Sequence, residues 1–168
     1  KWRIIIFNCR TSEAVGERND YNAVTDYLDP DAVKWFLNTV YEPLYEGVGE
    51  YFGNTVIQTF YDDVGIYNEE KTWTCKFNDK FRELTGKDPD LYYPALWYNI
   101  GPETEAARVA FFNTRAELLA DGFPKVLTDW GAEHNLQISG HAPGNYEIQP
   151  VDMCGDPFKF DRAQPIPM

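Results

Sequence analysis

Two adjacent carboxylates, Asp62 and Asp63, follow a strand-like run at residues 55–61. Successive side chains of a strand point to opposite sides, so only one of the two can enter a shared pocket while the other shapes the following loop. A carboxyl group desolvated by neighbouring aromatic side chains has a raised pKa, which is what a general acid near neutral pH needs. An Asp pair after a strand is also a common turn signal, so both interpretations stay open.

A second group of polar residues follows the strand-like run at residues 136–139. His141 follows that run after Gly140 and can donate a hydrogen bond to a ligand hydroxyl or act as a base, although a histidine there can equally be an ordinary loop residue. Glu147, in the loop beyond it, supplies a carboxylate that can face the Asp pair across a pocket. Loop acids are usually solvated, so this signal is weak by itself.

A third candidate follows the apolar run at residues 2–8, where Asn8 and Arg10 stand at the end of an expected strand. An amide and a guanidinium there can bind hydroxyls or a carboxylate. Arg10 can equally form an ion pair with an acid of its own loop.

Several common chemistries are excluded by the motifs that the chain lacks. It contains no GxSxG, P-loop, GxGxxG or HExxH pattern, and its two histidines cannot build a His-rich metal site. Carboxylate chemistry remains, and glycoside hydrolysis needs one protonated and one ionised carboxyl group. A Ca²⁺ site is a further hypothesis, although the spacing of its candidate oxygen ligands fits no EF-hand loop. Those ligands are Asp62, Asp63, Glu69 and Glu70.

The composition narrows the range of partners. The 168 residues carry 15 Lys and Arg against 27 Asp and Glu, a net charge of −12, which disfavours binding to nucleic acid or to an anionic membrane. The longest apolar run, residues 4–7, is too short to span a membrane. Aromatic residues make up 16% of the chain, and their faces suit sugars, although core packing accounts for most of them. No cofactor is indicated.

The elements that must position these residues alternate between strand and helix. Strand, helix, strand, helix, helix, strand is the order of an α/β fold with a parallel sheet and right-handed crossovers, in which functional residues gather at the carboxyl ends of the strands. Residues 92–98 are ambiguous because Pro94 disfavours a central strand. The expected helices are residues 30–44 after the Asp29 cap, residues 73–84 closed by Gly86, and residues 103–134 kinked or divided near Gly122 and Pro124.

Four stretches between about residues 26 and 141 resemble the catalytic barrel of α-L-rhamnosidase-type glycoside hydrolases of glycoside hydrolase family 106. They read DYLDPDAVKWFL, FYDD, KTWTCKFNDKFRELTGKDPDLYYPALW and DWGAEHNLQISGH. Within the third stretch the residues that match in order are Trp73, Thr74, Phe77, Phe81, Gly86, Asp88, Tyr93, Pro94 and Leu96. The resemblance implies a (β/α)8 barrel, here a partial one of three to four βα units.

The resemblance also implies the roles of individual residues. It puts the general acid at the end of the second strand, where Asp63 takes the place of a family glutamate, and it makes Glu147 the second carboxylate, acting as base or nucleophile. Inversion by direct attack of water is implied, with the two carboxyl groups about 6.5 to 9.5 Å apart. The implied substrate contacts are Arg10, Asp62, Trp73 and His141.

The chain departs from the family at the acid. Under another alignment Gly65 stands where the catalytic glutamate belongs, and the chain is then an inactive carbohydrate-binding or structural module of a larger glycosidase. The resemblance further implies a periplasmic or secreted bacterial protein that acts on plant or bacterial polysaccharides.

The length bears on the expected architecture. A complete barrel needs about 250 residues, so we expect the 168 residues to form one α/β domain that is a segment of a larger barrel. Open parallel edges and an exposed apolar face would then lead the chain to self-associate.

Overall fold

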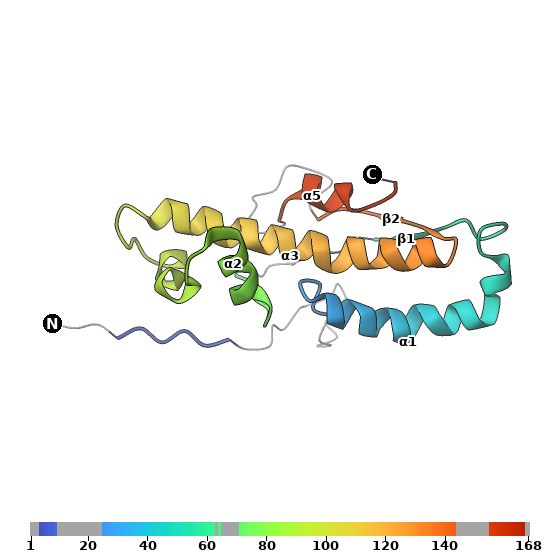
Figure 1. The fold of residues 1–168 in the computed structure, drawn as a ribbon, viewed down its shortest axis with the longest axis horizontal. Coiled ribbons are helices and arrows are strands. Elements are labelled where there is room, and N and C mark those ends of the chain that lie inside the picture. Colours follow the sequence, from blue (N-terminus) through green and yellow to red (C-terminus); the bar gives the residue numbers. More distant parts are fainter. Residues whose placement is uncertain (1–3, 10–24, 63, 65–70, 144–154, 167–168) are drawn as a thin grey trace.

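The computed structural model describes residues 4–9, 25–62, 64, 71–143 and 155–166. Its longest element is α3, Thr104–Glu133, against which α1, α2, β2 and α5 all pack. Figure 1 shows α1 along one side of α3 and α5 along the other. The other elements are α1 (Pro30–Val48), β1 (Gln58–Tyr61), α2 (Phe77–Thr85), β2 (Gln137–Gly140), α5 (Pro157–Arg162) and the 3-10 turns Gly49–Tyr51, Pro89–Leu91 and Tyr93–Leu96.

The first helix begins as its sequence predicts. The Asp29 side chain accepts a hydrogen bond from the Asp31 N–H at 3.0 Å, and Pro30 occupies the first helical position. The apolar stripe is only partly covered, because Val40 and Leu44 remain about half exposed. Part of this face of α1 is therefore open on the described chain.

The long helix α3 is continuous, so of the predicted kink or division near Gly122 and Pro124 the division is wrong. Both residues are buried inside the helix. A Cβ at Gly122 would lie 2.4 Å from the carbonyl oxygen of Tyr27, so glycine there lets the backbone before α1 cross α3 in close contact. The glycine serves helix packing and does not mark a break.

The two strands pair in parallel, with Gln58 opposite Gln137 and Tyr61 opposite Gly140. The connection between them contains α2 and α3, which confirms the α/β class with a parallel sheet. Within the described residues this sheet has two strands, so the expected barrel remains a proposal. β1 is shorter than the expected run of residues 55–61, and β2 has the expected four residues but lies one position later than residues 136–139.

Two further predictions need correction. Residues 4–9 form no strand, and Ile4 and Ile6 are 87% and 85% exposed, because an apolar run becomes a buried strand only where a sheet edge receives it. The second helix begins at Phe77 instead of Trp73, since the Phe77 N–H closes a turn onto the Thr74 carbonyl oxygen at 3.0 Å. The ambiguous residues 92–98 contain a 3-10 turn.

The core joins the helices to the sheet. Between α2 and α3, Phe81 packs on Phe111 with ring centroids 4.9 Å apart, and at the other end of α3 Leu127 lies in the same buried cluster as Ile138 of β2. α2 ends as predicted at Gly86, whose φ of 68° and N–H bond to the Arg82 carbonyl form a left-handed cap. None of the described helices is both long enough and apolar enough to cross a membrane.

Candidate functional site

Two of the predicted site residues meet at the carboxyl end of the parallel pair. The register places the last residue of β1 beside the last residue of β2, so the residues that follow, Asp62 and His141, leave the sheet next to each other. Nδ1 of His141 lies 2.8 Å from Oδ1 of Asp62. The His141 N–H also donates to the Tyr61 carbonyl oxygen at 3.3 Å, which extends the ladder by one bond.

The imidazole is oriented by its neighbours. The ring of Phe60 meets it edge to face, with centroids 5.0 Å apart. Contact with the Asp62 carboxylate through Nδ1 favours the tautomer that carries its proton on that nitrogen. These two contacts help to fix the orientation of the ring.

Gly140 allows the strand ends to approach closely. A Cβ at this position would lie 2.3 Å from both the carbonyl oxygen and a ring carbon of Tyr61. Real Cβ atoms essentially never come within 3.0 Å of such atoms. The pairing that brings Asp62 to His141 thus depends on a residue without a side chain at position 140.

The segment after α5 holds the end of β2 from the other side. Nε2 of Gln164 donates to the Gly140 carbonyl oxygen at 3.3 Å and to Oδ1 of Asp161 at 3.1 Å. Burial raises the pKa of Asp161 above its ordinary value, and the hydrogen bond from Gln164 opposes that shift. This support was missed in the sequence, because the contact joins residues 24 positions apart and no local pattern marks it.

Tyr61 is the last residue of β1 and is not suited to proton transfer. Its ring packs edge to face on Phe123 at 5.0 Å and lies 6.3 Å from Phe160. Burial, with a smaller contribution from the charge of Asp161, raises the pKa of Tyr61 far above its ordinary value. The hydroxyl therefore stays protonated at neutral pH.

In the Asp62–His141 pair the carboxylate is exposed to solvent and the imidazole is mostly buried. The Asp62 side chain is 72% exposed, and the His141 side chain is 20% exposed. A polar contact with this exposure contributes at most about 1 kcal/mol to stability. Its carboxylate oxygens accept hydrogen bonds, so the pair is suited to binding the hydroxyl groups of a ligand.

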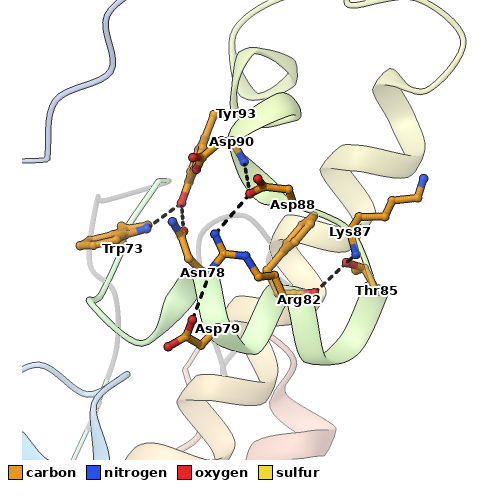
Figure 2. Close-up of polar contacts among 10 residues, drawn as sticks. Trp73, Asn78, Asp79, Arg82, Thr85, Lys87, Asp88, Asp90 and Tyr93 are labelled. Carbon is orange, nitrogen blue, oxygen red and sulfur yellow. Dashed lines mark hydrogen bonds and ion pairs between the residues drawn. The ribbon is translucent and has the colours of Figure 1, made fainter.

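Trp73 belongs to a different group of contacts. Its indole N–H donates to the Tyr93 hydroxyl at 2.8 Å, and Tyr93 donates to Oδ1 of Asn78 at 2.5 Å (Figure 2). None of the contacts between described residues joins Trp73 to Asp62 or His141.

Three predicted site residues lie outside the described residues: Arg10, Asp63 and Glu147. Glu69 and Glu70 of the Ca²⁺ hypothesis also lie outside them. The general acid, the second carboxylate and the Arg10 contact accordingly stay predictions. Over the described parts of the chain, no three His, Cys, Asp or Glu side chains gather in a way that could hold a metal ion.

Comparison with solved structures finds a similar fold in a rhamnosidase from Novosphingobium sp. PP1Y. The TM-score is 0.65, the sequence identity is 24%, and the match covers 83% of this chain and 13% of that chain. No protein-family description matches the chain, and no curated protein matches it. The similarity is one of fold, and this chain corresponds to a small part of the rhamnosidase.

Proposed function

We propose that this chain is part of the catalytic domain of a glycoside hydrolase that cleaves α-L-rhamnosides. The observation that carries the proposal is the Asp62–His141 pair at the carboxyl ends of two adjacent parallel strands, the position where α/β enzymes bind their substrates. The fold similarity to a rhamnosidase and the sequence stretches that resemble the same class support it.

Hydrolysis then follows the two-carboxylate scheme. Asp63 donates its proton to the glycosidic oxygen as the bond to the anomeric carbon breaks. Glu147, as the base, takes a proton from a water molecule that attacks the anomeric carbon from the opposite face. The product has the inverted configuration, and the two carboxyl groups stand about 6.5 to 9.5 Å apart.

Binding falls to the remaining residues. Asp62 and His141 hydrogen-bond to hydroxyl groups of the sugar, Arg10 contributes donors, and Trp73 contributes an aromatic face. The exposure of the Asp62 carboxylate and its contact with His141 support this role.

The same proposal includes a larger barrel. Parallel sheets occur almost only with both faces covered by other elements, whereas Ile57 and Phe60 are 58% and 47% exposed on this chain. The match to 13% of the rhamnosidase chain is also consistent with a part of a larger fold. Further strands beside β1 and β2 would complete the (β/α)8 arrangement.

The test is the hydrolysis of an aryl α-L-rhamnoside by the whole polypeptide that contains this chain. Asp63→Asn and Glu147→Gln should each lower kcat by a factor of about 10² to 10⁴, and Asp62→Asn should raise KM. Glu133→Gln is the matched control, because this exposed acid ends α3 at the opposite end of β2 from His141.

An inactive carbohydrate-binding module is the second candidate, and it is favoured by Gly65 at a position where the family carries an acid. Calorimetry that detects binding of rhamnosides, together with no release of sugar over days, would favour this candidate. Unchanged turnover in Asp63→Asn would contradict the assignment of the acid.

A further inference from the structure

Trp73 is an exposed aromatic residue whose orientation is fixed. Its side chain lies in the turn before α2, is 37% exposed, and extends away from that helix (Figure 2). The hydrogen bond from its indole N–H to Tyr93 and the bond from Tyr93 to Asn78 fix the angle of the ring. A ring that is already ordered loses little conformational entropy when a ligand stacks on it.

Tyr93 is anchored in turn by the core. Its ring lies 5.0 Å from that of Phe111 in α3, and burial raises its pKa above the ordinary value. The hydroxyl stays protonated at neutral pH, so it accepts from Trp73 and donates to Asn78 at the same time. The position of the exposed indole is thereby connected to the packing of α2 on α3.

A second exposed aromatic group continues this region. Trp97 is 49% exposed and stacks on Phe7 with centroids 5.1 Å apart, and Phe7 lies 6.2 Å from Tyr93. Phe7, Trp73, Tyr93 and Trp97 together are called the aromatic surface. It combines flat apolar faces with the hydroxyl and amide groups of Tyr93 and Asn78.

The charges around the aromatic surface favour a neutral ligand. Nζ of Lys71 already lies 5.7 Å above the Trp97 ring, so a cation of the chain itself faces that ring. Arg82 forms ion pairs with Asp79 at 3.2 Å and with Asp88 at 3.3 Å, so these two nearby acids are already paired with a cation of the chain (Figure 2). Anions are disfavoured by the net charge of −12.

We propose that the aromatic surface is a binding site for a neutral sugar ring, which stacks its C–H face on Trp73 while its hydroxyl groups form hydrogen bonds with the Tyr93 hydroxyl and the Asn78 amide. A pyranose offers one apolar face and a rim of hydroxyls, which matches this combination of groups. The inference deepens the proposed function and rests on it for the identity of the sugar. Beyond the aromatic face already proposed for Trp73, it assigns to Tyr93 and Asn78 the positioning of that face and the polar contacts beside it.

The experiment is calorimetry and tryptophan fluorescence during titration with a rhamnose-containing oligosaccharide. Trp73→Ala should weaken binding about tenfold. Tyr93→Phe keeps the ring but removes the hydroxyl that holds the indole, so it should weaken binding by a smaller factor without loss of the folded circular dichroism spectrum. Trp35→Ala is the matched control, because Trp35 is 67% exposed on α1 and lies outside the aromatic surface; its binding should be unchanged.

Equal binding by Trp73→Ala and Trp35→Ala would overturn the inference. Two other outcomes would also overturn it. One is saturable binding of tetramethylammonium with no binding of the sugar, which would indicate a cation site. The other is burial of Trp73, seen in its fluorescence, that increases with protein concentration, which would indicate contact between copies of the chain. Asp63→Asn separates this inference from the proposed function, because that variant should bind the oligosaccharide with unchanged Kd even if it hydrolyses nothing. Hydrolysis that persists while Trp73→Ala binds normally would contradict the aromatic site alone.

Discussion

Gly140→Ala is the substitution that most directly perturbs the strand pairing beneath the candidate site. The new Cβ would lie 2.3 Å from the Tyr61 carbonyl oxygen, whereas ordinary contacts begin at 3.4 Å, so the strands must separate by about 1 Å. The obstacle is backbone of β1, which cannot rotate away as a flexible side chain would. Gly140 does not have a positive φ, so backbone conformation adds no penalty.

The magnitude follows from two contributions. Overpacking of this kind costs about 1 to 3 kcal/mol. The hydrogen bond from the His141 N–H to the Tyr61 carbonyl oxygen, already 3.3 Å long, would be lost, which lowers the free energy of unfolding by about 1 kcal/mol more. We expect Gly140→Ala to lower the free energy of unfolding by about 2 to 4 kcal/mol, a large fraction of the 5 to 15 kcal/mol typical of a domain.

Gly47→Ala is the matched control. Gly47 lies in the last turn of α1, and a Cβ there would meet nothing within 4 Å. Alanine should stabilise the helix by about 0.5 kcal/mol. Urea unfolding followed by circular dichroism measures both variants, with the slope m expected to stay constant. If Gly140→Ala proved as stable as the unsubstituted chain, the close strand pairing described here would be refuted.

Two further predictions concern the acid behind β2 and the open face of the chain. Burial raises the pKa of Asp161, so the folded state binds a proton more tightly than the unfolded state and this carboxyl group destabilises the fold as the pH rises through its raised pKa. Asp161→Asn, which can still accept from Gln164, should therefore raise Tm at pH 7 and have little effect at about pH 3; an equal effect at both pH values would contradict this reasoning. Light scattering should find self-association, because Ile57 and Phe60 at β1 are exposed beside a strand edge that is unpaired among the described residues, and Ile57→Lys should reduce it; a monomer at every concentration would contradict this prediction.

The part of the site that the sequence could predict is the placement of Asp62 and His141 at the ends of the two short strands. Local patterns were sufficient to place Asp62 and His141 after strand-like runs, and parallel topology then requires such residues to leave the sheet at the same edge. The 2.8 Å contact between them also depends on the register and on the absence of a side chain at Gly140, which no local pattern specifies.

The errors have a common physical origin in long-range contacts. Residues 4–9 have strand composition but no partner strand among the described residues, and Phe7 instead packs on Trp97. Gln164 and Tyr93 act through hydrogen bonds to residues distant in the sequence, so no local pattern indicated these contacts. The capping residues Asp29 and Gly86, by contrast, act within one turn and were predicted correctly.

The most direct test of the proposed function is proton NMR of the first sugar released from an aryl α-L-rhamnoside by the whole polypeptide. The spectrum distinguishes the two anomers before they equilibrate in water. We predict that rhamnose is released and appears first as the inverted anomer, as expected for two carboxyl groups with a water molecule between them. Release of the retained anomer would contradict the mechanism, and the absence of any released rhamnose would contradict the proposed hydrolase activity.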